Sequence, residues 1–474
     1  MIVHVNYLPQ RRPGAGALVS DLFAAVEAAA PDPGVFARLR VHLDWVQYRQ
    51  NFREPVTVRR AIDCRGAPSG LVELAIDLRQ TVPATLPAAI TAALADACPQ
   101  VTIEPFGPLR GSLIWAFNNL FWQHVPAWEA LAGRSFEQAL PGGTSDASHE
   151  RAIADSVADF WTLLRDLEAR GHLPSEVFIL EIGVGTGGRV RRWLDRFRAL
   201  DAERGRGFYP RLRVLLSDYS SRILDRAAEA VRGHQEISSF IALDALNPFK
   251  TLSFLRYKVL QIHLANVYDN LPGDVMVRKD GRYHAVEARA YLTAGDAAAI
   301  AQAFDIPADD LARTITKFLE VGPDFFADRT RGVRFWQAAW AALKLEERLV
   351  ELEDLAAASL PTGVTPAHVE ECLADAPADL RFQLSTGAIE SFLNTVPLLH
   401  PRGYLQVHDI FVTSMDEYRH GFRGPGKLDG SVVNWVNGAL LREVGARAGY
   451  DVHFTPFHYR PGSSTKVLYT TPRD

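Results

Sequence analysis

The chain has 474 residues, enough for two or three domains, and its net charge of −5 argues against a protein that holds nucleic acid by bulk charge. Its three cysteines lie far apart, which predicts neither a disulfide framework nor a zinc site and favours a reducing, cytoplasmic location. No signal peptide and no apolar run long enough for a membrane span are found, so no membrane association is expected.

The first part of the chain, residues 1–108, has the pattern of an α+β accessory domain. Its predicted elements are a helix at 17–29, strands at 56–62 and 71–78, a helix at 86–97 and a strand at 101–105. Residues 109–172 are predicted to form a helical linker or lid, with Ser145 or Asp146 capping a helix that ends at Arg170. Five aromatic residues there favour a buried helix face, with the wall of an acceptor pocket as the alternative: Trp115, Phe117, Phe121, Trp122 and Trp128.

Strands and helices alternate in the remaining domain, residues 173–474. Continuous apolar strands followed by helices predict an open, doubly wound, mostly parallel seven-stranded α/β sheet with ligands at the carboxyl ends of its strands. A helical insertion at about 290–383 interrupts the alternation. The predicted strands are 177–182, 212–217, 238–243, 258–265 (partly exposed), 403–412, and a closing hairpin of 451–456 and 465–470; the predicted helices are 187–200, 220–231, 309–320, 333–355, 388–398 and 432–448.

One glycine-rich loop follows the first of these strands, in the stretch ILEIGVGTGGRV from Ile179. Through Gly188 it matches G-x-G-x-x-G, the fingerprint of dinucleotide-binding folds. Through Glu181, Gly183, Gly185 and Gly187 it matches E-x-G-x-G-x-G, the first motif of S-adenosylmethionine (SAM) methyltransferases. In either case glycines permit a tight turn against a ligand, and the following helix N-terminus suits an anionic group.

Two acids stand where the next two strands end, Asp218 and Asp244. Together with the glycine loop and the terminal hairpin, they make residues 177–471, apart from the insertion, resemble the class I SAM-dependent methyltransferases. The resemblance implies a Rossmann-like fold and SAM as cofactor. It places Glu181 near the methionyl end, Asp218 on the ribose hydroxyls, and Asp244 on the adenine amino group with Ala245 near the ring. Helix capping is the alternative role for both acids.

A narrower resemblance concerns residues 265–272, ANVYDNLP, which look like the stretch NEFFDALP of the protein arginine methyltransferase family of the complex I assembly factor type. Residues 418–450 resemble the same family's segment after the fifth strand. Asn266 stands where that family has a glutamate, so a carboxylate that could pair with a guanidinium is missing. The resemblance implies arginine methylation as an alternative function.

Candidate catalytic residues follow the fourth and fifth strands. Methyl transfer is an in-line displacement that depends on positioning, and it needs a base only when the acceptor must lose a proton. Asn266 could orient an acceptor, and Asp269 could take up a proton or pair with a cationic acceptor, unless both serve the turn. His408, beside Asp409, is the predicted general base, with packing as the alternative. No histidine–carboxylate spacing indicates a metal site.

These patterns predict a cytoplasmic, SAM-dependent methyltransferase acting on an O- or N-acceptor, with a small molecule favoured over a protein side chain. The alternatives are a protein arginine methyltransferase, a non-catalytic SAM-binding assembly factor, and an NAD(P)-dependent oxidoreductase. Phe335, Trp336 and Trp340 favour core or homodimer packing, with a hydrophobic acceptor lid as the alternative.

Overall fold

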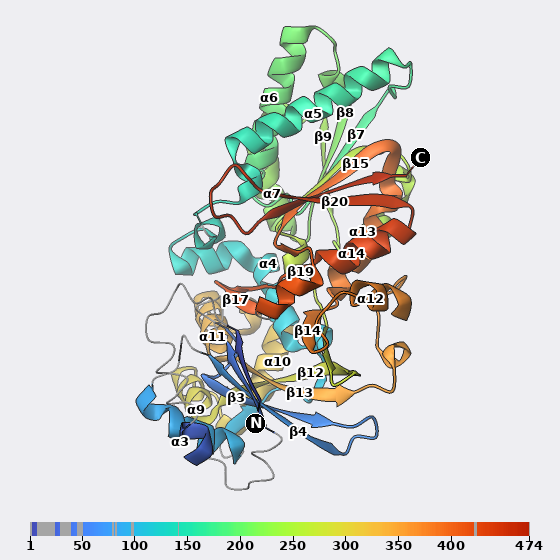
Figure 1. Ribbon diagram of the computed structural model, residues 1–474. Coiled ribbons are helices and arrows are strands. Elements are labelled where there is room, and N and C mark those ends of the chain that lie inside the picture. Colours follow the sequence, from blue (N-terminus) through green and yellow to red (C-terminus); the bar gives the residue numbers. More distant parts are fainter. Residues whose placement is uncertain are drawn as a thin grey trace.

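The computed structural model describes residues 2–6, 24–28, 39–44, 51–77, 80, 83–95, 99–140, 142–420 and 424–473. The molecule is elongated and has two large sheets, one of seven strands and one of ten (Figure 1). The C-terminus lies beside the first sheet and the N-terminus beside the second. Of the helix expected at 17–29, residues 24–28 are helical and the rest lies outside the described residues.

The seven-stranded sheet has the order β20-β21-β15-β10-β7-β8-β9. All neighbouring pairs are parallel except those made by β21, which is antiparallel to both β15 and β20. The predicted doubly wound sheet with a closing antiparallel hairpin is therefore confirmed. Its strands are β7 (Val177–Ile182), β8 (Leu212–Asp218), β9 (Ser238–Ala242), β10 (Val259–Ala265), β15 (Leu399–Asp409), β20 (Tyr450–Pro456) and β21 (Lys466–Pro472).

Helices cover both faces of this sheet, as Figure 1 shows. On one face Phe160, Trp193 and Phe197 form the centre of a core cluster, and on the other face Phe392 and Leu441 do so. The strand β10 is almost wholly buried because it lies mid-sheet between these two layers, so the expected partial exposure is wrong. The helices are α5 (Glu150–Ala169), α6 (Gly188–Arg204) and α7 (Ser221–Ala230) on the first face, and α8 (Pro248–Leu252), α13 (Thr386–Thr395) and α14 (Gly438–Arg447) on the second.

The ten-stranded sheet combines strands from the start of the chain with strands inserted between β10 and β15. Its main path is β1-β2-β4-β3-β13-β12-β11-β14, and β5 and β6 also pair with β12. Its strands are β1 (Ile2–Asn6), β2 (Leu39–Asp44), β3 (Val56–Ile62), β4 (Pro68–Asp77), β5 (Gln100–Thr102), β6 (Gly107–Pro108), β11 (Val275–Lys279), β12 (Arg282–Thr293), β13 (Lys344–Glu351) and β14 (Leu380–Gln383).

The helix expected at 333–355 is wrong in its second half, where β13 pairs with β12 and β3. Leu345 and Leu349 lie four residues apart, a spacing that fits one face of a helix and also one face of a strand. Here both are buried in the strand, and the charged residues between them pair across the sheet. The insertion thus supplies strands as well as helices, and the division of the chain into domains stays a prediction.

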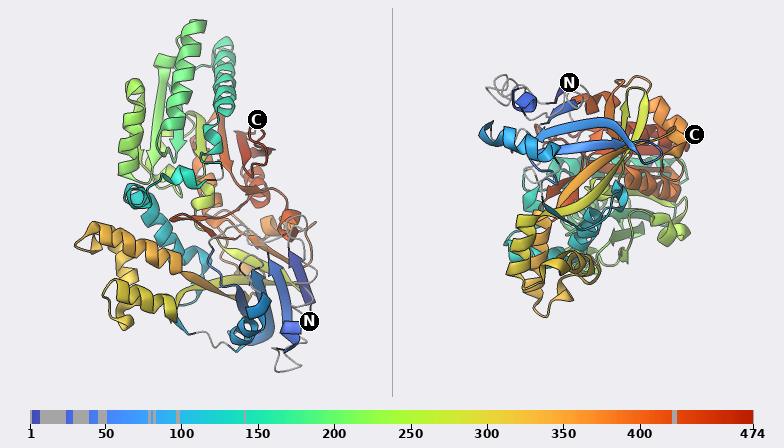
Figure 2. Two further views of the ribbon diagram at one scale, coloured as in Figure 1. Left: turned by 90° about the vertical axis from the view of Figure 1, so that its left-hand side faces the viewer. Right: turned by 90° about the horizontal axis from the view of Figure 1, so that it is seen from below.

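Further helices and short strands complete the molecule. The helices α9, α10 and α11 lie together at one end of the ten-stranded sheet, away from the N-terminal strands (Figure 2, left). Bounds are α3 (Leu86–Leu94), α4 (Leu113–Ala132), α9 (Ala294–Ala303), α10 (Leu311–Val321), α11 (Arg329–Ala342), α12 (Pro366–Cys372), β16 (Phe411–Val412), β17 (Gly426–Leu428), β18 (Ser431–Val433) and β19 (Val436–Asn437).

The helix α4 carries the aromatic residues expected to form a buried face. Phe117 packs on Trp340, and Phe121 and Trp128 pack on Trp336, with ring centroids 4.7 to 6.3 Å apart. These contacts confirm core packing for Phe117, Phe121 and Trp128 of α4 and for Trp336 and Trp340 of α11. They also anchor α4 on α11, and α4 contacts the helix α7 that packs on the seven-stranded sheet.

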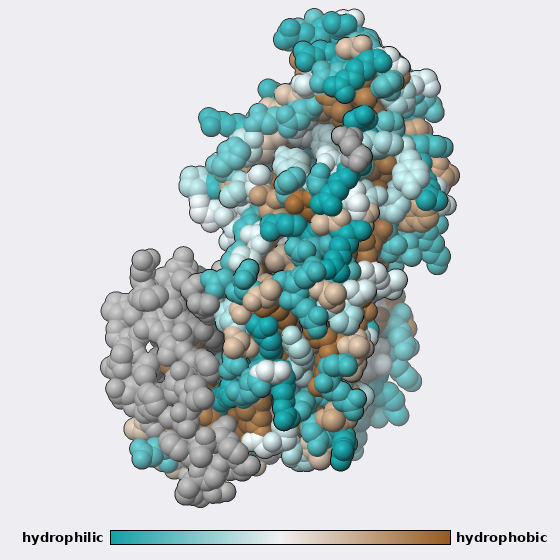
Figure 3. Space-filling view, turned by 45° about the vertical axis from the view of Figure 1, so that its right-hand side comes forward, coloured by the Kyte–Doolittle hydropathy of each residue, from teal (hydrophilic) through white to brown (hydrophobic). Residues whose placement is uncertain are grey.

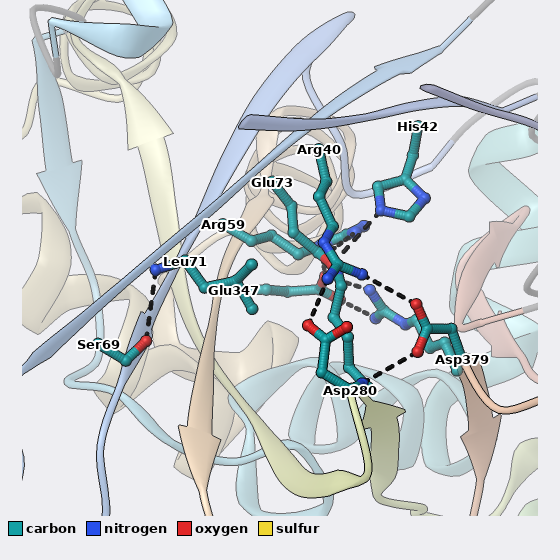
Figure 4. A network of polar contacts seen from close by, with 11 residues as sticks. Arg40, His42, Arg59, Ser69, Leu71, Glu73, Asp280, Glu347 and Asp379 are labelled. Atoms are coloured by element: carbon teal, nitrogen blue, oxygen red, sulfur yellow. Dashed lines mark hydrogen bonds and ion pairs between the residues drawn. The ribbon is translucent and has the colours of Figure 1, made fainter. Parts of the chain in front are cut away.

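Buried charges join the strands of the second sheet (Figure 4). Glu347 of β13 accepts from Arg59 Nε at 2.6 Å and from Arg381 Nη2 at 2.7 Å, and Glu73 of β4 pairs with Lys279 of β11. Burial alone would raise the pKa of Glu347, but the two guanidinium groups hold it well below its usual range. Ion pairs therefore tie strands from the start of the chain to strands more than 200 residues later.

Within the described residues, no helix has both the length and the apolar character needed to cross a membrane. On the face in Figure 3, hydrophilic and hydrophobic side chains are interspersed over the described surface. The cytoplasmic location stays a prediction.

Candidate functional site

The glycine loop joins β7 to α6 at the carboxyl edge of the seven-stranded sheet. Gly183, Gly185 and Gly187 have φ values of 74°, 56° and 75°, which favour glycine. A Cβ on Gly183 would lie 2.5 Å from Val267 Cγ2, and one on Gly187 would lie 2.9 Å from Ala227 Cα. Gly188, by contrast, begins the helix, and a Cβ there would make an ordinary contact. The backbone therefore requires the glycines of E-x-G-x-G-x-G, but not the third glycine of the dinucleotide pattern.

Asp218, at the end of β8, supports this loop. Its carboxylate accepts hydrogen bonds from Gly185 N at 3.1 Å and Ser220 N at 3.3 Å. Burial raises the pKa of Asp218, and the backbone hydrogen bonds oppose the rise. Asp244 accepts from Leu246 N at 2.9 Å, whereas Asn247 caps α8, so the capping alternative for Asp244 is wrong.

A cavity of about 270 Å³ lies between the glycine loop, the ends of β7 to β10, the helix α4 and the turn between β17 and β18. All but three of the predicted site residues line it. Gly187, His408 and Asp409 do not. The structure therefore brings most of the predicted cofactor-binding and catalytic residues around one cavity: Glu181, Gly183, Gly185, Asp218, Asp244, Ala245, Asn266 and Asp269.

Glu181 lies at the floor of this cavity and is 5% exposed. It accepts from Arg189 Nη1 at 2.8 Å and lies 3.2 Å from His263 Nδ1. Burial alone would raise the pKa of Glu181, but Arg189 and His263 lower it. Sequence reasoning missed Arg189, which lines the cavity from the first turn of α6. The signal was available, because a buried carboxylate at a strand end requires a cation close by.

Asn266 and Asp269 form the turn after β10. Asn266 has a left-handed φ of 54°, and its Oδ1 accepts from Ser145 Oγ at 2.9 Å. Asp269 is 4% exposed and accepts from Asn270 Nδ2 at 2.8 Å. Burial, and then the charge of Asp409, raise the pKa of Asp269 well above its usual range. The cavity thus contains a carboxyl group that keeps its proton in more alkaline solution than a free aspartate does.

The sheet order, the closing hairpin and the position of this loop decide the fold. The chain has the class I methyltransferase fold. No protein-family model and no curated protein matches the sequence.

Several solved structures of methyltransferases are similar in shape. A likely methyl transferase from Burkholderia thailandensis, bound to S-adenosyl-homocysteine, is 13% identical with a TM-score of 0.45, over 81% of this chain and 91% of that one. A magnesium protoporphyrin IX methyltransferase from Synechocystis, with the same molecule bound, is 12% identical with a TM-score of 0.32, over 75% and 97%. The CMeT domain of the citrinin polyketide synthase is 12% identical with a TM-score of 0.33, over 99% and 91%. At such low similarity, the function of this chain rests on its own residues.

His408 and Asp409, the pair expected to provide the general base, lie behind the cavity. His408 is 5% exposed, and its Nδ1 is 3.2 Å from His263 Nε2. Burial, and then His263 and Arg189, hold the pKa of His408 well below its usual range. Asp409 accepts from the backbone N–H groups of Tyr268 and Asp269, at 2.9 and 3.3 Å. This geometry gives both residues positions from which they support the cavity wall without lining it.

The far wall of the cavity comes from α4, which sequence reasoning assigned only to packing or an acceptor pocket in general terms. Trp122 Nε1 donates to Asn270 Oδ1 at 3.1 Å, and Asn118 Nδ2 donates to Asn270 O at 2.8 Å. Asn118 Oδ1 also accepts from Val432 N at 2.9 Å. The wall is therefore fixed by hydrogen bonds to the turn that carries Asp269. Among the described residues, no group of three or more metal-ligating side chains could hold a metal ion.

Proposed function

We propose that the chain is a SAM-dependent methyltransferase that modifies a small O- or N-acceptor. One observation carries this proposal: the glycine loop, Asp218 and Asp244 line the same cavity at the carboxyl edge of a sheet with the class I strand order. Ligands of open α/β sheets bind at this edge. The residues present fit SAM, because positive-φ glycines leave room for it and a carboxylate stands at each of two strand ends.

Each residue has a role in this proposal. The N-terminus of α6 and Arg189 offer positive charge to the methionyl carboxylate. Asp218 accepts from the ribose hydroxyls, Asp244 accepts from the adenine amino group, and Ala245 contacts the ring. Bound SAM supplies the methyl group on its sulfonium.

The acceptor occupies the part of the cavity bounded by Trp122, Asn266 and Asp269. The cavity of about 270 Å³ must hold the cofactor as well, so the space beside the cofactor favours a small molecule or a single extended side chain. Asp269 takes up the proton of an O–H or N–H acceptor, and Asn266 and the face of α4 position the acceptor. Catalysis then depends mainly on alignment of the acceptor with the methyl group.

An arginine side chain is the second candidate acceptor, since Asp269 places a carboxylate in the cavity. It ranks second because Asn266 stands where the arginine methyltransferase family has a glutamate, so a carboxylate that could pair with a guanidinium is missing. A non-catalytic SAM-binding protein would bind the cofactor and transfer no methyl group to any acceptor.

Replacing Asp218 with alanine is expected to weaken SAM binding by about 1–3 kcal/mol, the scale of hydrogen bonds to a charged group. Titration calorimetry measures the change. Asp225→Ala, at an exposed position on α7, is the matched control and should bind as the unmodified protein does. Unchanged affinity in a folded Asp218→Ala protein would remove Asp218 from the site.

A further inference from the structure

A second cavity, of about 250 Å³, lies between α5 and the C-terminal hairpin of β20 and β21. Asp155 and Asp159, on successive turns of α5, face it together with three aromatic rings: Phe457, Tyr459 and Tyr469. Among the described residues that line it, two are aspartates, two are histidines and none is lysine or arginine. The cavity therefore has an acidic and aromatic lining, which favours a cation.

A buried chain of side chains connects the two cavities. Glu181, which lines the first cavity, lies 3.2 Å from His263 Nδ1, and His263 Nε2 lies 3.2 Å from His408 Nδ1. These residues stand on the neighbouring strands β7, β10 and β15, and His263 is in register with Glu181. His408 lines the second cavity. The two cavities are thus linked by three residues and two hydrogen bonds.

The chemistry of Glu181, His263 and His408 fixes which of their atoms carry protons. Arg189 and His263 keep Glu181 ionised, so its carboxylate only accepts hydrogen bonds. Burial lowers the pKa of both imidazoles, so each carries a single proton near neutral pH. His263 must then donate from Nδ1 to Glu181 and accept at Nε2 from His408 Nδ1. His408 Nε2 is left without a proton.

The unprotonated His408 Nε2 can accept a hydrogen bond, and no donor contacts it within the described residues. His408 is 95% buried, with 5% of its surface exposed, and it lines the second cavity. Within the part of the chain that the structure describes, the only hydrogen bond of its imidazole is the one through Nδ1. The unpartnered Nε2 therefore favours a ligand that brings an N–H or O–H group.

The two carboxylates add charge to this preference. Asp155 accepts from the Tyr459 hydroxyl, whereas Asp159 has no hydrogen bond or ion pair within the described residues. Burial, and then the charge of Asp155, raise the pKa of Asp159. A cation between the two carboxylates would reduce the repulsion between their negative charges. The rings of Phe457 and Tyr459, whose centroids are 5.3 Å apart, add a surface that attracts cations.

We propose that the second cavity binds a small organic ammonium ion, with one N–H donating to His408 Nε2 and the charge facing Asp155 and Asp159. Two carboxylates on successive helical turns also suit a diammonium ion. The same chemistry could come from a free amine or from a lysine side chain of a peptide, and the test separates these two sources.

The test is calorimetric titration of the cofactor-free protein with 1,4-diaminobutane, and with 1,4-butanediol as a neutral molecule of the same length. The diamine is expected to bind at one site and the diol is not. Asp159→Asn should weaken diamine binding at least tenfold. Asp166→Asn, exposed on the same helix and paired with Arg165, should leave diamine binding unchanged.

Absence of diamine binding to the folded protein, or equal binding to Asp159→Asn, would overturn the proposal. Tighter binding of N-acetyl-lysine amide would identify a lysine side chain as the occupant, and weaker binding a free amine.

Occupation of the second cavity should also change the affinity for SAM, because the chain of His408 and His263 ends on Glu181 in the first cavity. This coupling rests on the proposed function, and by linkage SAM must change the affinity for the diamine by the same factor. The diamine titration is done without cofactor, so a failure of SAM binding would leave its result intact.

Discussion

Replacing Asp269 with asparagine is expected to lower methyl transfer by about 100-fold or more, the scale of a general base, while SAM affinity is retained. Asp269 lines the cavity beside the turn of Asn266 and is the carboxyl group there whose pKa burial and Asp409 raise most. An amide of the same shape keeps the turn but cannot take up a proton. Transfer of labelled methyl groups to an acceptor found by screening measures the effect.

The pH profile distinguishes a base from a packing residue. Because the pKa of Asp269 is raised, its ionised form becomes more abundant as pH rises, so transfer should increase with pH in the unmodified protein. Asp269→Asn should lose this rise. Asp409→Asn removes the neighbouring negative charge and should move the rise to lower pH. Identical profiles in the unmodified protein and Asp269→Asn would show that Asp269 is not the base.

The second large effect concerns stability. Glu347→Gln is expected to lower the free energy of unfolding by about 3 kcal/mol, because it removes the buried carboxylate with which both Arg59 and Arg381 form ion pairs. Arg59 is 7% exposed and Arg381 is 14% exposed, so water cannot replace the carboxylate. Urea unfolding measures the loss. Glu353→Gln, at an exposed position after β13, is the matched control.

The pH dependence of this stability has a defined sign. The folded pKa of Glu347 is lowered, so its contribution is fully present above the unfolded value, about 4.3, and is lost as pH falls toward the folded value. The difference in the free energy of unfolding between the unmodified protein and Glu347→Gln should stay constant from about pH 6 to pH 8 and become smaller below about pH 4. A difference that widens in acid would contradict the ion-pair account.

The seven-stranded sheet could be predicted because β7, β8 and β9 each lead into a helix, and because β20 and β21 form a hairpin around a Pro-Gly turn. The second sheet could not, because Arg348 of β13 pairs with Arg60 of β3, nearly 300 residues away, and no local pattern encodes that register. The segment of β13 also shows why the helix was expected, since Leu345 and Leu349 satisfy both periodicities.

The cofactor half of the site follows from local signals, because the glycines directly follow the strand β7 and the two acids stand at or just after the ends of β8 and β9. The acceptor half does not. Strand-end placement put His408 near the site, but the contact with His263 that holds its imidazole behind the cavity depends on packing between β10 and β15. The wall formed by Asn118 and Trp122 comes from a helix about 150 residues before the turn it contacts.

The central claim is that the glycine loop holds SAM. Calorimetric titration of the unmodified protein with SAM, S-adenosyl-homocysteine and NADH tests it most directly. The account predicts that the first two bind at one site and that NADH does not, because the backbone does not require the third glycine of the dinucleotide pattern. Binding of NADH without binding of SAM would contradict it.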